Sequence, residues 1–414
     1  MARTFGTVRD SALMRFGVLI LPTESWVDQG QTWRHAEALG FDHAWTFDHL
    51  AWRSLRDAPW FGAVPTLAAA AAITSRIRLG TLVASPNFRH PVPFARELMT
   101  LDHISAGRFT LGIGAGGSGF DATTTRREPW GSRERADRFE EFVTLLDELL
   151  TEPVTTHDGR YYQAFGARMH PDCLQRPRLP FAVAAGGPRG MRLAARFGTT
   201  WVTEGPLAPD GSALGVGSAL PGLAAELGRI DAACTEVGRD PATLGRLLCV
   251  GMRISGVTAS PEAFRDAVGR FEELGVTDVV VPWPRRAAPF AGDTDTFELV
   301  AAEARARGAA SRGRRNPPER GRPWQGRPAG SARPRFPSPP GAFQPRRRRR
   351  PITASRQRSS RACTGPASWQ RSSSLRACRP PRSSRNSGGW RSRRGSCRRS
   401  RCREYPPPCY RWWR

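Results

Sequence analysis

The sequence has no lysine, so every one of its 63 basic residues is an arginine. Cysteine is scarce outside the C-terminal quarter: Cys173, Cys234 and Cys249 are odd in number and lack the spacing of metal ligands. We therefore expect reduced thiols, with no disulfide framework and no metal site. No apolar run approaches the roughly 20 residues of a transmembrane helix, and the first residues lack the apolar stretch of a secretory signal. These absences predict a cytoplasmic protein that does not enter a membrane.

Acidic residues are almost missing from the C-terminal quarter, and this explains the net charge of +26. Residues 311–414 hold 30 of the 63 basic residues but only two of the 37 acidic ones, which leaves 33 arginines against 35 acids in residues 1–310. A strongly basic protein would suggest a nucleic-acid partner. The first 310 residues are near neutral, so we expect no nucleic-acid binding by this part.

The same C-terminal segment also lacks the residues that build a core. From residue 311 onward it has one Leu, one Ile, no Val and no Met, and it is rich in Arg, Pro, Ser and Gly. Such a segment cannot bury enough apolar surface to offset its chain entropy, so we expect a disordered tail over 307–414. Its content is typical of GC-rich DNA translated in an unselected frame, and we interpret it as a frameshifted or read-through extension. A nucleic-acid-binding arm and a disordered tail of no assigned role are the alternatives.

The rest of the chain alternates short apolar runs with amphipathic segments. We expect an N-terminal extension over 1–13 and one folded domain over 14–306. The predicted strands are 15–21, 42–47, 77–83, 108–114, 181–185, 199–204, 246–254 and 278–283. The predicted helices are 30–39, 64–74, 92–104, 132–151, 189–197, 220–237, 261–274 and 294–306. Strands that each precede a helix predict an α/β fold, a (β/α)8 TIM barrel, with an open doubly wound sheet as the alternative. Residues 154–180 are longer than a normal connection and predict an insertion with a hairpin at Asp158-Gly159.

In such a barrel the reacting groups gather at the C-terminal ends of the strands. The second predicted strand ends in FDHLAW, which contains Asp48, His49 and Trp52. Histidine exchanges a proton near neutral pH with little tuning of its pKa, so His49 is the candidate acid or base. A structural histidine is the alternative at this point.

Two glycine clusters follow strands four and five. AGGPRG, with Gly186 and Gly187, opens a predicted helix whose bare backbone N–H groups suit a phosphate, and Arg189 adds a positive charge nearby. Tight turns are the alternative for these glycines. GIGAGGSG, residues 112–119, matches a dinucleotide fingerprint only loosely, because no helix or acid follows at the expected distance. Close approach of the backbone to a flat cofactor ring suits it better.

These segments together resemble the luciferase-like monooxygenase superfamily of flavin- and deazaflavin-dependent oxidoreductases, over residues 14–305. The resemblance is carried by MRFGVLILP, by ALGFDHAWTFDHL, by the segment RIRLGTLV through GIGAG, by DGRYY, and by FAVAAGGPRGMRLAARFGTTWVTEGP. FDHL together with AAGGP is most similar to members that use the deazaflavin coenzyme F-420.

The resemblance implies a role for each candidate residue. Asp48 would contact the deazaflavin headgroup, and His49, with Trp52 near it, would exchange a proton with the substrate. The residues implied around the ring are Leu82 and Val83, joined by a non-prolyl cis peptide bond, and Ser85, Ala115 and Gly116. The residues implied at the phosphate arm are Gly186, Gly187, Pro188, Arg189 and Gly190.

The implied function is hydride transfer between coenzyme F-420 and a small organic substrate. An FMN-dependent monooxygenase that uses reduced flavin and oxygen is the first alternative, and nucleic-acid binding through the Arg-rich tail is the second. Gly117 stands where sugar-phosphate and alcohol dehydrogenases of this type carry Glu, and the lack of lysine removes ammonium groups for a sugar phosphate. Both features disfavour a sugar-phosphate substrate. The resemblance also leaves a homodimer open.

Overall fold

The structure is a computed structural model, and it describes residues 14–313. The expectations for residues 1–13 and for the tail beyond residue 313 lie outside the described residues. Within the described range, no helix combines the length and the apolar character needed to cross a bilayer.

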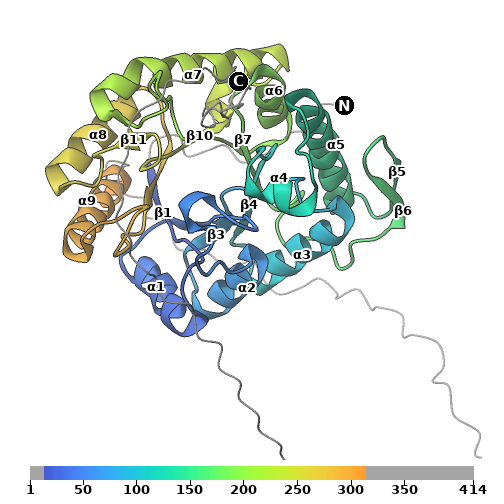
Figure 1. The fold of residues 1–414 in the computed structure, drawn as a ribbon, viewed down its shortest axis with the longest axis horizontal. Helices are drawn as coiled ribbons and strands as arrows, with labels where there is room; N and C mark the ends of the chain where they lie inside the picture. The colour runs from blue at the N-terminus through green and yellow to red at the C-terminus, as the bar shows by residue number, and fades with distance from the viewer. Residues whose placement is uncertain (1–13, 314–414) are drawn as a thin grey trace, which may run out of the picture. The chain divides into compact units, whose positions relative to one another are not determined.

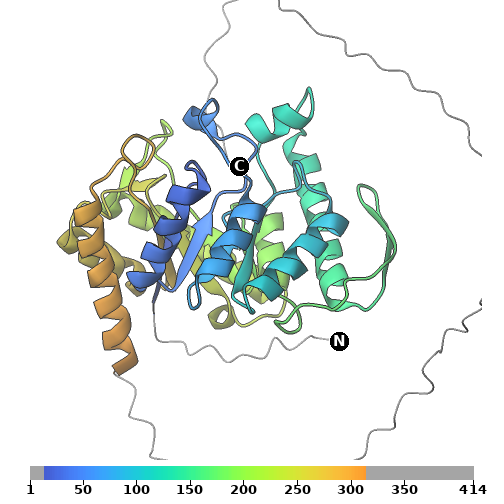
Figure 2. The ribbon, with the colours of Figure 1, turned by 90° about the horizontal axis from the view of Figure 1, so that it is seen from below.

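Eight strands of the described region close into a parallel barrel, which confirms the predicted fold class (Figure 1). The strands are β1 (Arg15–Leu19), β2 (His43–Thr46), β3 (Arg78–Thr81), β4 (Phe109–Gly114), β7 (Phe181–Ala184), β8 (Thr200–Thr203), β10 (Gly245–Cys249) and β12 (Asp278–Pro282). They follow one another around the barrel in chain order, and β12 closes it by pairing with β1 from Arg15↔Asp278 to Leu19↔Pro282. Figure 2 shows the same barrel from the side, with its loops gathered at the two ends.

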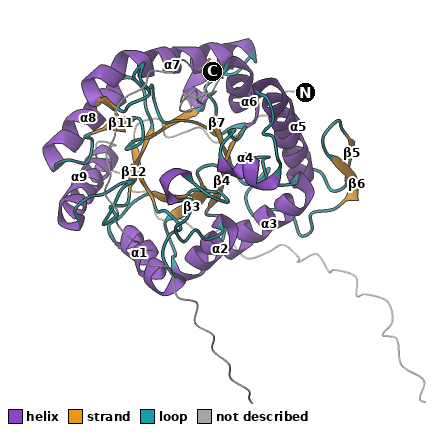
Figure 3. Cartoon of the chain, in the orientation of Figure 1, coloured by secondary structure: helices purple, strands orange, loops and turns teal. Residues whose placement is uncertain are grey.

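Helices surround the strands on the outside, apart from the short helix α4, which lies over one end of the barrel (Figure 3). They are α1 (Trp26–Ala38), α2 (Ala63–Ile73), α3 (Pro91–Ile104), α4 (Phe120–Thr125), α5 (Ser132–Thr151), α6 (Pro188–Phe197), α7 (Val216–Glu236), α8 (Pro261–Glu273) and α9 (Thr294–Gly313), with short 3-10 turns at Arg53–Leu55 and Pro241–Thr243. The prediction of 132–151 matches α5 at both ends, because its apolar residues recur along one face at helical spacing.

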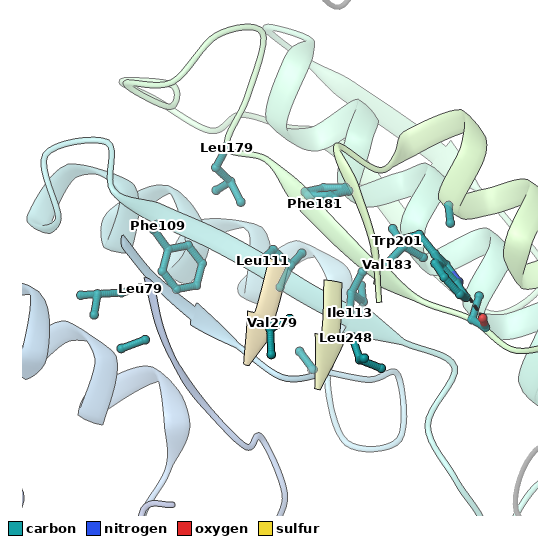
Figure 4. Close-up of a cluster of buried hydrophobic side chains, with 14 of the residues drawn as sticks. Leu79, Phe109, Leu111, Ile113, Leu179, Phe181, Val183, Trp201, Leu248 and Val279 are labelled. Atoms are coloured by element: carbon teal, nitrogen blue, oxygen red, sulfur yellow. Dashed lines mark hydrogen bonds between the residues drawn. The ribbon is translucent and has the colours of Figure 1, made fainter. Parts of the chain in front are cut away.

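Alternating side chains of the strands divide the core into two layers. One layer packs against the helices, and Figure 4 shows part of it, with Leu111 and Ile113 of β4 beside Phe181 and Val183 of β7. The other layer fills the barrel interior and contains, among others, Leu19, Trp45, Phe47, Trp52, Val202, Leu247 and Val280. Strands buried on both faces explain why they read as nearly continuous apolar runs in the sequence.

Bulky interior side chains require a small residue on the neighbouring strand. A Cβ built at Gly80 of β3 would stand 2.4 Å from the ring of Trp45, which the register places directly opposite on β2. Glycine at this position therefore makes room for the indole inside the barrel.

A buried polar network joins the first, second and last strands at their starts. Asp278 of β12 accepts hydrogen bonds from Arg15 Nη2 at 2.9 Å, Thr277 Oγ1 at 2.6 Å and His43 Nε2 at 3.2 Å. Trp45 Nε1 donates to His43 Nδ1 at 2.6 Å, so the histidine is satisfied on both nitrogens. Burial by itself raises the pKa of Asp278, but the hydrogen bond from His43 and the charge of Arg15 outweigh it and lower that pKa well below its usual range.

Several elements differ from the sequence prediction, among them α1, which begins at Trp26 and not at residue 30. The strand predicted over 246–254 ends at Cys249, since Gly251 adopts a φ of 93°, and Ile254–Ser255 forms a separate strand, β11, paired with β9 (Leu214–Gly215). Helix α7 begins at residue 216, four residues before the predicted start at 220, and it contains Pro221 within its first two turns. Helix α9 continues to Gly313, beyond the predicted helix end at residue 306. Helix α4 was not predicted, because its six residues are too short to show a period.

The insertion after α5 was predicted with its hairpin. Strands β5 (Thr155–Asp158) and β6 (Gln163–Ala167) pair antiparallel, and the turn is closed by the Gly159 N–H donating to the Tyr162 carbonyl at 3.0 Å. Glu141 of α5 accepts the backbone N–H groups of Tyr161 and Tyr162, which holds the hairpin against the barrel.

Candidate active site

His49 lies just beyond the C-terminal end of β2, at the end of the barrel where parallel strands of this fold present their catalytic groups. Its Nδ1 is 2.5 Å from Oδ2 of Asp121, in the first turn of α4, and its ring is 29% exposed while the Asp121 side chain is 9% exposed. The other oxygen of Asp121 accepts the backbone N–H groups of Leu50 at 2.7 Å and Ala51 at 3.3 Å. Two segments 72 residues apart in the chain are thereby joined at one point.

Aromatic rings surround His49. The ring of Phe47 stands edge-on at a centroid distance of 5.8 Å, and Trp60 lies 6.2 Å away and donates its Nε1–H to the His49 carbonyl at 2.7 Å. Trp52 is 6% exposed and stacks between Trp60 at 6.1 Å and Phe290 at 6.3 Å. Trp52 therefore belongs to the buried wall behind His49 and continues the apolar interior of the barrel.

Asp48 has a partner that the sequence did not reveal. It is 2% exposed, and its two oxygens accept Nε and Nη2 of Arg89, each at 2.7 Å. Arg89 also donates to Glu97 at 3.2 Å and lies over the ring of Phe94 at 4.4 Å. Burial lowers the pKa of Arg89, but its hydrogen bonds to Asp48 and the charges of Asp48 and Glu97 outweigh it and raise that pKa, so the guanidinium stays positively charged. Both oxygens of the Asp48 carboxylate thus bind Arg89 and hold the loop after β3 in place.

The ends of β3 and β4 form a narrow backbone platform. The Leu82–Val83 peptide bond is cis, as the resemblance implied, and the chain rejoins β4 at once through the Ala84↔Ile113 bridge. The side chain of Val83 lies over Gly114, where a built Cβ would come within 2.9 Å of it. Glycine there leaves room for Val83.

Gly116 and Asn87 meet one loop further along. Gly116 has a φ of 71°, and a Cβ there would stand 2.8 Å from the Asn87 amide nitrogen. Asn87 is 3% exposed; its amide donates to the Gly117 carbonyl at 3.1 Å, while its Oδ1 is buried with no hydrogen-bond partner among the described residues. Ser85, also buried, accepts the Asn87 N–H at 3.4 Å through its hydroxyl, so Ser85 and Gly116 both lie beside Asn87, and Ala115 directly precedes Gly116 in the chain.

Helix α6 begins at the glycine pair after β7. Gly187 is its N-cap and Pro188 its first residue, and a Cβ built at Gly187 meets nothing within 4 Å. The free N–H groups of a helix start, left uncovered by any side chain, form an anion-binding arrangement. A Cβ built at Gly190, in the first turn of α6, would stand 3.0 Å from the Ala185 Cβ, so glycine there permits close packing of the helix on its strand.

Arg189 points its charge elsewhere. Its guanidinium pairs with Asp137 at 2.6 Å and Glu140 at 2.8 Å, both on α5. The hydrogen bonds that Arg189 donates to Glu140 and Asp137 raise its pKa. Its predicted help to a phosphate stays a prediction, and in this structure the guanidinium ties α6 to α5.

Three residues of this end of the barrel escaped the sequence reasoning: Asp121, Asn87 and Arg89. Asn87 and Arg89 stand in a strand-end segment, so their position was a usable signal. Asp121 lies two residues after Gly119, the last glycine of the cluster that follows β4. An acidic residue so close to a strand end was the signal that could have identified it. The partner of each of the three residues could not be predicted from the sequence, because each contact joins the loops of two different strands.

Known proteins share this architecture and much of this sequence. Residues 13–244, more than half of the chain, match the model of the luciferase-like monooxygenase family. An F-420-dependent glucose-6-phosphate dehydrogenase of Beutenbergia cavernae is 41% identical over 172 residues, which is 40% of this chain and 49% of that protein. A 4-hydroxyprotoasukamycin monooxygenase of Streptomyces nodosus subsp. asukaensis is 32% identical over 199 residues, 47% of this chain and 49% of that one. The chain thus spans about half the length of the curated relatives that it matches.

The fold is also found among solved structures. A coenzyme F-420-dependent tetrahydromethanopterin reductase from Methanopyrus kandleri superposes with a TM-score of 0.55 at 20% identity, over 70% of this chain and 98% of that one. The structural likeness shows that the two proteins share the barrel fold. From the family match over residues 13–244, the chain belongs to the luciferase-like monooxygenase family.

Proposed function

We propose that this protein is an oxidoreductase that moves a hydride between coenzyme F-420 and a small organic alcohol or carbonyl compound. The observation that carries the proposal is the His49–Asp121 contact, which sets a partly exposed imidazole between the ends of β2 and β4. The similarity to F-420-dependent relatives supports the choice of coenzyme. Because the chain spans about half of the relatives it matches, their substrates are not assumed here.

The residues present fit a deazaflavin. The buried, unpartnered Oδ1 of Asn87 fits a bound group that carries an N–H, and the uncovered N-cap at Gly187 fits a phosphate. Leu82, Val83, Ser85, Ala115 and Gly116 would hold the ring, while Gly186, Gly187, Pro188 and Gly190 would hold the phosphate arm. Asp48 would act there through Arg89, by holding the loop that carries Ser85 and Asn87.

When bound, the coenzyme supplies a carbon that accepts or returns a hydride. The protein's own residues handle the proton. In the oxidation direction the substrate hydroxyl gives its proton to His49 as its carbon gives up the hydride, and the product is the carbonyl compound. In the reverse direction His49 returns that proton to the oxygen. Each turnover moves one hydride, which carries both electrons, and one proton, and no other reactant is needed.

The surroundings of His49 favour an apolar substrate. Phe47 and Trp60 are the rings beside the imidazole, and Trp52 closes the wall behind them. Together with Gly117 and the lack of lysine, this favours an alcohol with an aliphatic or aromatic body over a sugar phosphate.

Coenzyme titration tests the proposal directly. We expect F-420 to bind with micromolar or tighter Kd and FMN to bind at least tenfold more weakly, and F-420 to be reduced in the presence of 2-propanol, cyclohexanol or benzyl alcohol but not glucose 6-phosphate. Tight FMN binding with oxygen uptake and no F-420 binding would instead establish the monooxygenase alternative.

Two helix-cap glycines offer a matched pair of variants. Gly187 and Gly215 are the N-caps of α6 and α7, and a Cβ built at either meets nothing within 4 Å. Aspartate is a good N-cap, so neither Gly187→Asp nor Gly215→Asp should lower the melting temperature. Only Gly187→Asp puts a carboxylate where the phosphate is proposed, and it should raise the Kd for F-420 at least tenfold. If both variants changed the Kd for F-420 equally, the phosphate would not bind at Gly187.

We also propose a cytoplasmic location and a homodimer, with a small molecule as the substrate and no nucleic-acid partner for the barrel. Light scattering of the purified protein gives its oligomeric state. Deleting residues 311–414 separates the barrel from the Arg-rich tail, and salt-sensitive DNA binding that disappears on deletion would assign that binding to the tail.

A further inference from the structure

We propose that Asp121 is a positioning residue that sets the tautomer of His49, so that Nε2 is the nitrogen that exchanges the proton. The inference rests on the proposed function for its catalytic meaning, but its structural part stands without any coenzyme or substrate. It concerns which of two ring nitrogens carries the hydrogen, a choice that the sequence leaves open.

The argument begins with the hydrogen-bond capacity of the carboxylate. Oδ1 of Asp121 already accepts the N–H groups of Leu50 and Ala51. An ionised carboxylate only accepts hydrogen bonds, so the 2.5 Å contact between Oδ2 and Nδ1 requires the hydrogen to be on the His49 ring. Nδ1 is therefore the donor in this pair, and the neutral imidazole carries its lone pair on Nε2.

Nε2 is the nitrogen left free for a ligand. Nε2 has no hydrogen-bond partner among the described residues. Among these residues, the buried polar atoms that lack a partner do not include it, so Nε2 is not fully buried. It is therefore open to solvent beside the rings of Phe47 and Trp60. A substrate hydroxyl that meets His49 meets this nitrogen.

Asp121 is itself held in place from the neighbouring strand end. Helix α4 is tied to the loop after β3 because Thr125 Oγ1 and Arg126 Nη2 both donate to the Asn87 carbonyl, at 3.3 and 2.8 Å. On the other side, Trp60 Nε1 donates to the His49 carbonyl at 2.7 Å. The imidazole is thus fixed through its ring by α4 and through its backbone by Trp60, which is the preorganisation that proton transfer requires.

A purely structural role of Asp121 makes a different prediction. If the residue only clamps the N–H groups of Leu50 and Ala51, Asp121→Asn preserves that clamp, because the amide oxygen replaces Oδ1. The amide NH2 then faces Nδ1 and donates to it, which forces the hydrogen onto Nε2. A positioning role predicts loss of function from this variant, whereas a clamp predicts none.

The direct test is nitrogen NMR of protein labelled with 15N-histidine, without coenzyme, at a pH where the neutral ring dominates. The chain has seven histidines, and His49→Gln identifies the signal by its disappearance. We expect the Nδ1–H tautomer in the wild-type protein and the Nε2–H tautomer in Asp121→Asn. Asp240→Asn is the matched control, because Asp240 also accepts a backbone N–H but contacts no histidine, and it should leave the His49 signal unchanged. An Nε2–H tautomer in the wild type overturns the inference.

Kinetics supply the second readout. With whichever alcohol of the panel reduces F-420, kcat of Asp121→Asn should fall about 10²- to 10⁴-fold, as expected for a histidine in the wrong tautomer, while KM and the Kd for F-420 change less than threefold. Asp121→Glu keeps a carboxylate and should restore both the Nδ1–H signal and part of kcat, which separates positioning from misfolding. An unchanged kcat in Asp121→Asn refutes the proposal. If F-420 does not bind at all, the proposed function fails, while the tautomer result still decides the role of Asp121.

Discussion

Closure of the barrel between its first and last strands should depend on Asp278. The Asp278→Asn variant puts an NH2 group where one carboxylate oxygen now accepts donors from Arg15 and either Thr277 or His43. Breaking a buried charge pair costs about 3–5 kcal/mol. The Arg15 side chain is 42% exposed and regains water, whereas that of His43 is 6% exposed and cannot, so we place the loss of unfolding free energy at the lower limit, about 3 kcal/mol.

The loss should also depend on pH in one direction. Because the folded-state pKa of Asp278 is lowered, its contribution is complete above the unfolded value of about 3.9 and disappears as the pH falls below it. Urea unfolding should therefore show the full difference between wild type and variant at pH 7, and a difference smaller by about 1 kcal/mol at pH 3.

A matched surface variant separates this network from a general effect of losing a carboxylate. Asp266 is 59% exposed and pairs with Arg270 one helical turn away, so Asp266→Asn should change stability by no more than about 0.5 kcal/mol. A loss below about 1 kcal/mol for Asp278→Asn, or a difference that is the same at pH 3 and pH 7, would refute the reasoning.

Three further predictions address packing, the site and a buried phenol. Gly112→Ala puts a Cβ 1.8 Å from a carbonyl oxygen of β3 and should lower the free energy of unfolding by about 3 kcal/mol or more. In Gly269→Ala, in α8, the added Cβ meets nothing within 4 Å, so the free energy of unfolding should rise by up to about 1 kcal/mol. Thermal unfolding of the two variants and the wild type measures both changes. Trp60→Phe keeps an aromatic ring beside His49 but removes the N–H that donates to the His49 carbonyl, so kcat should fall about fivefold. An unchanged kcat would show that this hydrogen bond is dispensable. Burial raises the pKa of Tyr162 to about 12, so the absorbance titration of wild type minus Tyr162→Phe should have its midpoint there and not near the ordinary value of about 10.

Much of the fold could be predicted because the relevant signal is local. Several barrel strands, such as β4 and β7, are buried on both faces and read as short apolar runs, and α5 shows its buried face at helical spacing. The failures are also local in origin. Gly251, with its positive φ, ended a strand that apolar character alone would have continued, and α4 was too short for any periodicity.

The candidate site divides in the same way. The prediction of His49 as acid or base followed from its place after β2, and that of an anion site at Gly186-Gly187 followed from glycine before a helix start; both stay predictions. The partners did not follow. Asp48 binds Arg89, 41 residues away, and Arg189 turns to α5, which leaves the α6 start without the charge expected there.

By itself the sequence determined the alternation of strands and helices, the family, the location of the +26 charge in the C-terminal quarter, and the residue that handles the proton as a candidate. Only the tertiary structure decided what each polar side chain contacts, and above all that Asp121 faces His49 across 72 residues of chain. The reason is physical. Hydrophobic periodicity is a pattern among residues close together in the chain, so the sequence shows it directly. A hydrogen bond instead requires two atoms about 3 Å apart in space, and closure of the barrel determines which strand ends come that close.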